Sequence, residues 1–153
     1  MLLSDFALKE IEPRHAAVIR AEVPMAELRD VFDRGFHAVM SAVQASGAQI
    51  IGPPFGFYPR MPSETVEVLV GFPVDRAIAL AGDVEPFTLP GGTVLTGVHV
   101  GPYETMMETY DQLMAWVKRE GIELGPAMWE TYLTDPGEAP PSEWRTELYW
   151  PVV

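Results

Sequence analysis

The sequence predicts an α+β (α/β) fold of two related strand–helix–strand–strand modules, with a largely antiparallel sheet and both helices on one face of it. Two observations support this prediction. Segments with strand and helix periodicity occur in the same order twice along the 153 residues. Proline landmarks also repeat, because Pro24 and Pro102 are 78 positions apart, as are Pro73 and Pro151 (102 − 24 and 151 − 73). The modules are therefore expected to form a pseudo-twofold pair within a single domain, 1–153.

The first module, residues 10–75, is expected to contain one helix and three strands. The helix is predicted where apolar residues recur three and four positions apart, and Gly47 is expected to end it. Strands are predicted where apolar and β-branched residues cluster between turn residues. The predicted ranges are a strand at 15–23, the helix at 26–45, a weak strand at 49–58 that prolines interrupt, and a strong strand at 65–72.

A connection over residues 76–92, rich in glycine, proline and alanine, leads to the second module, residues 93–153. A short strand is expected within the connection, at 87–89. The pattern from Thr105 to Glu108 predicts a capping box at the start of the second helix, and Gly121 is expected to end that helix. Strands are predicted at 93–100, 125–133 and 144–150. Gly–Pro pairs at 52–53 and 125–126 are 73 positions apart (125 − 52), which fits a longer first helix and a longer second hairpin.

The strand expected at 125–133 carries a glutamate at its centre. Alternation divides its side chains into two faces: Met128, Glu130 and Tyr132 on one, and Ala127, Trp129, Thr131 and Leu133 on the other. Glutamate is uncommon in strands and costly to bury alone, so either this face is wet or Glu130 is kept for something it binds. With both helices on one side, we expect the opposite side of the sheet to be concave, with Glu130 near its centre.

Composition excludes several classes of function. The net charge of −12, from 10 Lys+Arg and 22 Asp+Glu, disfavours direct binding of nucleic acid or anionic membranes and favours cationic partners. The absence of cysteine excludes disulfides, thiol nucleophiles and thiolate metal sites. No stretch approaches the ~18 apolar residues of a membrane span, and the N-terminus does not read as a signal peptide. We therefore expect a cytoplasmic protein.

Neither a metal nor a cofactor is expected. The three histidines are scattered over two predicted strands and a helix, so no pair has the spacing of metal ligands. Gly91-Gly92 lacks the lysine and the strand–turn–helix context of a phosphate loop. The histidines are accordingly interpreted as structural residues.

Four motifs follow one another in the second module. They are His99-x-Gly101-Pro102-Tyr103-Glu104, Tyr110-x-x-Leu113-x-x-Trp116, Pro126-x-x-x-Glu130-x-Tyr132-x-x-Asp135-Pro136, and Thr146-Glu147-Leu148-Tyr149-x-Pro151-Val152. With these motifs the chain resembles the GyrI-like small-molecule-binding domains, which include effector-binding domains of multidrug-responsive bacterial regulators. The resemblance covers essentially the whole chain. It implies two pseudo-symmetric halves, a cleft for apolar and often cationic aromatic compounds, and Glu130 as the key acid.

The candidate site is built around Glu130. Tyr103, at the start of the second helix, could aim into the cleft or simply pack there. Trp129 should point away from Glu130 and pack under the helices unless a bulge reverses the strand, and Tyr110 is assigned to the core. Tyr149 shares a face with Glu147, a candidate second acid. The candidate ligand-binding residues are Glu130, Tyr103, Met128, Tyr132, Tyr149, Phe55, Phe57 and Trp129, of which the two phenylalanines would form an apolar wall opposite the acid.

Three functions remain open at this point. The first is a stand-alone binding protein for hydrophobic aromatic, cationic compounds. The second, implied by some members of the family, is hydrolysis of cyclopropane-containing genotoxic compounds, with Glu130 as general base and Tyr103 as the assisting hydroxyl. The third is inhibition or regulation of a protein partner such as DNA gyrase. Glu130 would serve binding and hydrolysis equally well, so the sequence leaves open whether the chain is an enzyme.

Overall fold

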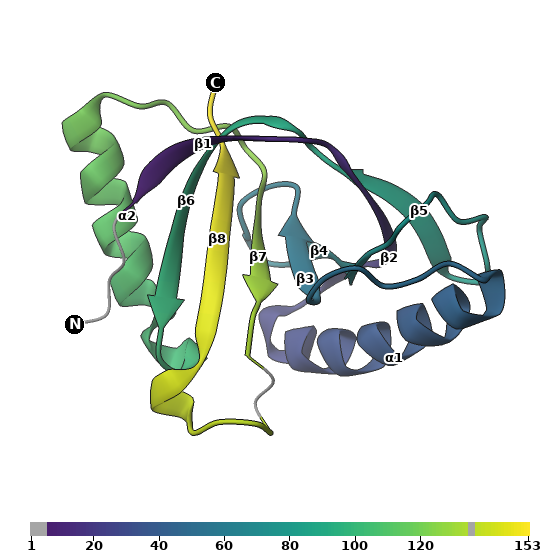
Figure 1. Cartoon of the computed structure of the whole chain (residues 1–153). Helices are drawn as coiled ribbons and strands as arrows, with labels where there is room; N and C mark the ends of the chain where they lie inside the picture. The colour runs from purple at the N-terminus through teal and green to yellow at the C-terminus, as the bar shows by residue number, and fades with distance from the viewer. Residues whose placement is uncertain (1–5, 135–136) are drawn as a thin grey trace.

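The computed structural model describes residues 6–134 and 137–153. In these ranges the chain forms one eight-stranded sheet and two α-helices (Figure 1). The strands are β1 (Ala7–Ile11), β2 (Arg14–Val23), β3 (Phe55–Tyr58), β4 (Val66–Pro73), β5 (Val84–Leu89), β6 (Gly92–Val100), β7 (Met128–Tyr132) and β8 (Arg145–Pro151). The helices are α1 (Leu28–Ser46) and α2 (Met106–Glu120). Single 3-10 turns occupy Met25–Glu27, Tyr103–Thr105 and Pro141–Glu143.

The sheet has the strand order β1-β6-β8-β7-β3-β4-β2-β5, and all neighbouring strands are antiparallel. The predicted fold class is therefore confirmed. The predicted weak strand at 49–58 forms only at Phe55–Tyr58, because Pro53 and Pro54 cannot donate to a ladder. Strand β1 is absent from the sequence prediction, because its exposed edge carries Lys9 and Glu10 and shows no apolar pattern.

The strand register reproduces the duplication. Adding 78 to each residue number carries the pair Ala16–Pro73 onto the pair Val94–Pro151, in agreement with the spacing of the proline landmarks. The same shift relates Ala7 to Glu85 and Val18 to Thr96. Ala7 pairs with Thr96, and Val18 pairs with Glu85. Strands β1 and β5 are thus equivalent, and each pairs with the edge of the other half. The repeated unit is strand–strand–helix–strand–strand, with its first strand exchanged.

The two halves join through β3 and β7, where Gly56 lies directly opposite Glu130. The 73-residue shift of the Gly–Pro landmarks would make Phe57 the counterpart of Glu130, but these two side chains lie on opposite faces of the sheet. A twofold axis perpendicular to a sheet keeps each residue on its face. A shift of 74 (130 − 56) satisfies this condition, and it makes Tyr58 the counterpart of Tyr132.

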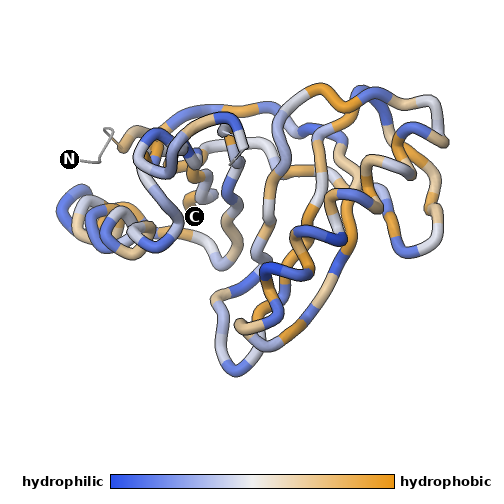
Figure 2. The backbone as a smooth tube through the Cα atoms, turned by 90° about the horizontal axis from the view of Figure 1, so that it is seen from below, coloured by the Kyte–Doolittle hydropathy of each residue, from blue (hydrophilic) through white to orange (hydrophobic). Residues whose placement is uncertain are grey.

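Both helices pack on one face of the sheet, each over its own half (Figure 1). Each turn of both helices contains hydrophobic and hydrophilic residues, as an amphipathic helix requires (Figure 2). Gly47 and Gly121 end α1 and α2 in the left-handed conformation, as predicted. The capping box is not formed. Thr105 instead donates its hydroxyl to the carbonyl of Pro102, at 2.9 Å.

The other face carries no helix and is buried by the curl of the sheet itself (Figure 1). Phe57 of β3 and Phe87 of β5 are separated by two strands in the sheet order, yet their ring centroids are 5.0 Å apart. A flat sheet would hold them much farther apart. The fold therefore has two distinct interiors, one under the helices and one inside the curled sheet. Within 6–134 and 137–153, neither helix is long and apolar enough to cross a membrane.

Candidate functional site

Glu130 lies on the helix face of the sheet, between α1 and α2. The alternation predicted for this strand is confirmed, since Met128, Glu130 and Tyr132 point to the same face. The carboxylate accepts a hydrogen bond from Tyr110 of α2 at Oε2, and one from Tyr132 at Oε1 with a length of 2.8 Å. The expectation that Glu130 faces the concave, helix-free side is therefore wrong. The helices cover the two outer halves, and the side chains of the central strands rise between them.

Three phenols surround the carboxylate. Tyr58 hydrogen-bonds Tyr132, which in turn bonds Glu130. Burial, and then the charge of Glu130, raise the pKa values of Tyr58, Tyr110 and Tyr132 well above the ordinary value of 10, so all three keep their protons, and Tyr110 and Tyr132 donate theirs to the carboxylate. Burial also raises the pKa of Glu130, while the two phenol donors and the nearby His99 oppose this shift. The carboxylate is thus held by donors in a poorly hydrated setting.

Aromatic rings from both halves enclose this group. Phe32 of α1 meets Tyr132 edge to face, with centroids 5.6 Å apart, and Phe36 lies 6.5 Å from the same ring. Tyr103, before α2, packs against Tyr132 at 6.0 Å and against Trp144 at 5.1 Å, and is 42% exposed. Such rings present negative faces that attract cations and planar apolar groups. Tyr103 is therefore at the solvent edge of the site, and Glu130 at its base.

Two buried polar residues of β6 and β8 border the site. His99 is bonded within the fold, with Nδ1 2.6 Å from the hydroxyl of Thr109 and Nε2 3.0 Å from the carbonyl of Pro102. Thr146 pairs with His99 and Tyr132 in the neighbouring strands and is fully buried. Its hydroxyl has no hydrogen-bond partner in the described part of the chain. Thr146 therefore offers an unused polar contact close to Glu130.

Four of the candidate residues lie on the other face of the sheet. Trp129 points away from Glu130, as predicted, but packs in the curled interior and not under the helices. Its ring stacks between Phe57 at 5.8 Å and Tyr149 at 5.3 Å. Phe55 belongs to the same cluster. The structure thus brings Tyr103, Met128 and Tyr132 together with Glu130, and separates Phe55, Phe57, Trp129 and Tyr149 from it.

Sequence reasoning missed the closest partner of Glu130. Tyr110 was assigned to the core because it falls in the apolar stripe of the second helix, and its ring does pack there. A buried tyrosine needs a partner for its hydroxyl, and a strand glutamate needs donors. Pairing the hydroxyl of Tyr110 with the carboxylate of Glu130 would have satisfied both groups and predicted this contact. Phe32 and Thr146 carried no comparable signal, whereas Tyr58 follows Phe57 in the segment predicted as the first-half counterpart of the Glu130 strand.

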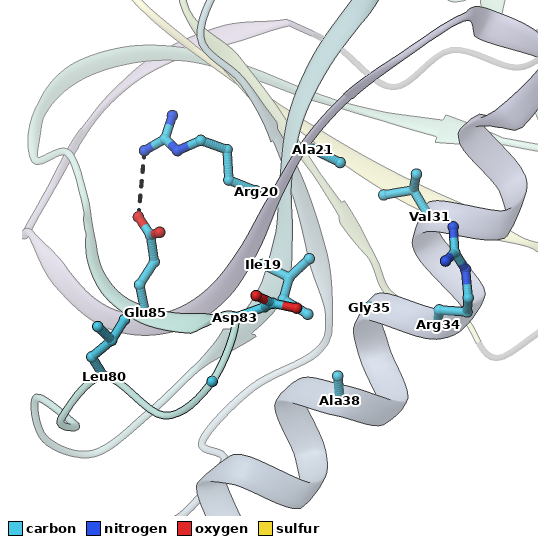
Figure 3. Close-up of a pocket in the computed structure, with 11 residues that line it drawn as sticks. Ile19, Arg20, Ala21, Val31, Arg34, Gly35, Ala38, Leu80, Asp83 and Glu85 are labelled. Carbon is cyan, nitrogen blue, oxygen red and sulfur yellow. Dashed lines mark hydrogen bonds and ion pairs between the residues drawn. The ribbon is translucent and has the colours of Figure 1, made fainter.

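A cavity of about 630 Å3 lies elsewhere, between α1 and the β2–β5 edge (Figure 3). Its wall combines small apolar residues of β2 and α1 with charged side chains, and it contains no aromatic ring. Arg20, on this wall, is already paired with Glu67 at 3.1 Å. It also pairs with Glu85 at 3.5 Å, as Figure 3 shows. This cavity therefore offers no aromatic stacking surface, and its other charged side chains, Arg34 and Asp83, form no ion pair within residues 6–134 and 137–153. It does not reach Glu130.

The chemistry available at Glu130 is that of a carboxylate among phenols. It can pair with a cation, or accept a proton as a general base. No group of three His, Asp or Glu side chains suited to a metal ion occurs in the ranges 6–134 and 137–153. The Asp135-Pro136 end of the third sequence motif lies outside the described residues.

The raised pKa of Glu130 predicts a specific pH dependence of stability. The folded state binds this proton more tightly than the unfolded chain, so the stabilisation is fully present below the ordinary pKa of 4.5 and is lost as pH rises through the raised value. Glu130→Gln cannot ionise. We expect its free energy of unfolding, relative to the wild type, to increase from pH 4.5 towards neutrality in urea titrations. A difference independent of pH would contradict this, and exposed Glu123→Gln is the control.

The chain is similar in sequence or in structure to several known proteins. Residues 4–153 match the model of the GyrI-like small molecule binding domain. No curated protein matches the sequence significantly. The crystal structure of the EcmrR C-terminal domain superposes with a TM-score of 0.84 at 25% identity, covering 100% of this chain and 99% of that one. In the EcmrR–DNA complex the match covers 97% of this chain but 57% of the EcmrR chain, so this chain spans little more than half of that protein's length.

Two further structures share the fold at lower identity. SAV2435 bound to tetraphenylphosphonium gives a TM-score of 0.69 at 10% identity, covering 98% of this chain and 94% of that one. A hydrolase from Listeria innocua gives a TM-score of 0.68 at 12% identity, covering 97% and 92% of the two chains. Likeness at these identities shows the fold alone.

Proposed function

This chain belongs to the GyrI-like small-molecule-binding domain family, and we propose that it takes up hydrophobic aromatic, cationic compounds at Glu130. The observation that carries the proposal is a carboxylate held by two phenol donors, and enclosed by aromatic rings from both halves of the fold. A cation at this place gains charge attraction in a poorly hydrated site, together with the faces of the rings. The fold-level similarity to SAV2435, a structure that holds tetraphenylphosphonium, agrees with this ligand class.

Selection at this site would depend on shape and charge. The phenols of Tyr110 and Tyr132 already occupy one lone pair of each carboxylate oxygen, so a ligand needs no N–H donor to satisfy the group. Aromatic side chains fill the space around Glu130, and we infer that Tyr103, at the solvent edge, moves aside as the ligand enters. Rotamer changes of this kind are common at binding sites.

The test compares a cation with a neutral compound of similar shape. Methyltriphenylphosphonium and triphenylphosphine oxide are titrated calorimetrically into the wild-type protein from pH 5 to pH 9. We expect the phosphonium to bind more tightly, and its advantage to grow as pH rises through the raised pKa of Glu130, because only the ionised carboxylate attracts it. Equal affinity for both compounds at every pH would refute the charge argument.

Hydrolysis of a strained ring is the second candidate, because Glu130 is placed as a base beside several phenols and a hydrolase shares the fold. In this reaction Glu130 takes a proton from water as the water oxygen bonds to a carbon of a cyclopropane ring. The ring C–C bond breaks towards a conjugated acceptor, which then takes up a proton, so one water is added in total. Tyr103 would orient the water or the acceptor oxygen.

Mass spectrometry separates the two candidates. A cyclopropane-bearing aromatic compound is incubated with wild type, Glu130→Gln and Tyr103→Phe. Gain of one water with the wild type, abolished by Glu130→Gln, supports hydrolysis. Recovery of unchanged compound that co-elutes with the protein supports binding alone.

A further inference from the structure

The helix-free face of the sheet contains its own cavity, of about 500 Å3. Pockets for small molecules measure roughly 300–1,000 Å3. Its floor is formed by Phe55, Leu89 and Trp129, none of which is more than 6% exposed. Trp129 and Glu130 are neighbours in a regular strand, so they point to opposite faces. The sheet itself therefore separates this cavity from the site at Glu130.

Prolines restrict the backbone around this cavity. Four prolines line it: Pro13, Pro53, Pro73 and Pro90. The turn before β2 closes against the turn before β6, because a Cβ at Gly91 would lie 2.5 Å from Cδ of Pro13. A proline ring fixes one backbone dihedral, so little ordering is needed when a ligand enters. These features describe a preformed pocket.

Opposite charges face this cavity without neutralising each other. Glu147 accepts a hydrogen bond of 2.5 Å from Tyr149, and both residues line the wall. Arg14 lines it too. Burial and the bond to Glu147 raise the pKa of Tyr149, and the charge of Arg14 opposes this rise, so the guanidinium acts on the same phenol. Among the described residues no ion pair joins Arg14 to Glu147 or to another carboxylate.

The other groups at the rim do not change this balance. Lys9 and Glu12 add one charge of each sign, and neither forms an ion pair in the described part of the chain. Thr131 also lines the cavity. An apolar aromatic floor, one carboxylate and one guanidinium match a small molecule that carries a ring, an ammonium and a carboxylate.

We propose that this cavity is a second binding site, for a small aromatic zwitterion of the aromatic α-amino acid or dipeptide class. The ring lies against Phe55 and Trp129, the ammonium donates to Glu147, and the Arg14 guanidinium donates to the carboxylate. This inference does not rest on the function proposed at Glu130.

The probe is L-phenylalanine, compared calorimetrically with phenethylamine, which lacks the carboxylate, and 3-phenylpropionate, which lacks the ammonium. We expect both analogues to bind the wild type at least about tenfold more weakly, since each loses one charged contact. Glu147→Gln should weaken the binding of phenylalanine and of phenethylamine by about tenfold or more, and leave the affinity for phenylpropionate unchanged. Arg14→Gln should weaken the binding of phenylalanine and of phenylpropionate, and leave the affinity for phenethylamine unchanged.

Three results would overturn the proposal. They are no binding of phenylalanine at millimolar concentration, equal binding of the zwitterion and its two analogues, or loss of binding in Glu130→Gln, which would move the ligand to the helix face. Circular dichroism shows whether Glu147→Gln folds. If it does not, the proposal is tested by Arg14→Gln, since Arg14 is exposed, and by the comparison of the three compounds on the wild type. If the phosphonium does not bind, the proposal for this cavity still stands. If phenylalanine does not bind, the proposal for the Glu130 site still stands.

Discussion

Replacing Glu130 with glutamine is expected to weaken the binding of methyltriphenylphosphonium by about 30- to several-thousand-fold. The affinity for triphenylphosphine oxide should stay nearly unchanged. Truncating one partner of a poorly hydrated ion pair costs about 2–5 kcal/mol, which gives this range. Glutamine keeps the size of the side chain and one acceptor for the phenol of Tyr110 or Tyr132. The change therefore removes the charge and preserves most of the packing.

Calorimetric titration of both compounds at pH 8 measures this effect. Glu123→Gln, an exposed residue outside the site, removes the same charge from a protein of net charge −12 and controls for long-range attraction. Similar losses for the charged and the neutral compound would mean that glutamine disturbs the shape of the site. In that case the selection of cations would need another source.

Leu113→Ala is expected to lower the free energy of unfolding by about 2–5 kcal/mol, the usual cost of a large-to-small change in a core. Leu113 is 1% exposed and is the buried anchor of α2 in the cluster that contains Leu95, Leu148 and Trp150. The change leaves a cavity under the helix that supplies Tyr110. Urea denaturation followed by circular dichroism measures the loss.

Met107→Ala is the matched control for this variant. It removes a large apolar side chain from the same helix, but at a position that is 67% exposed, where the loss should stay within about 0.5 kcal/mol. Equal losses in the two variants would contradict the packing of α2 against the sheet.

The fold was predictable because local and long-range signals agreed. Apolar periodicity located both helices, and the proline spacing gave the register shift of 78 that pairs Ala16 with Pro73 and Val94 with Pro151. Strand β1 was not predictable, because its pairing with β6 is made by backbone groups and its side chains are mostly exposed. An edge strand needs no apolar pattern to be held in place.

The candidate site was predictable in its centre but not in its surroundings. Alternation alone placed Met128 and Tyr132 with Glu130. Which face of the sheet the helices cover depends on how the strands are ordered, and a single sequence does not give that order. For this reason Tyr110 was not linked to Glu130. The strand register, which pairs Glu130 with Gly56 and Leu148, puts Phe55, Phe57 and Tyr149 on the other face.

The exchanged edge strands also constrain how the chain can fold as it is synthesised. Ala7 pairs with Thr96, so β1 has no backbone partner until β2, α1, β3, β4, β5 and β6 have all emerged from the ribosome. The contact closes a loop of most of the chain, and pairings at such separations are slow to form. A nascent first half would meanwhile expose the edge of β2, because β5 must arrive to cover it. We therefore expect a ribosome-bound chain arrested before β5 to be sensitive to proteases, and protection to appear once the connection between the halves has been translated.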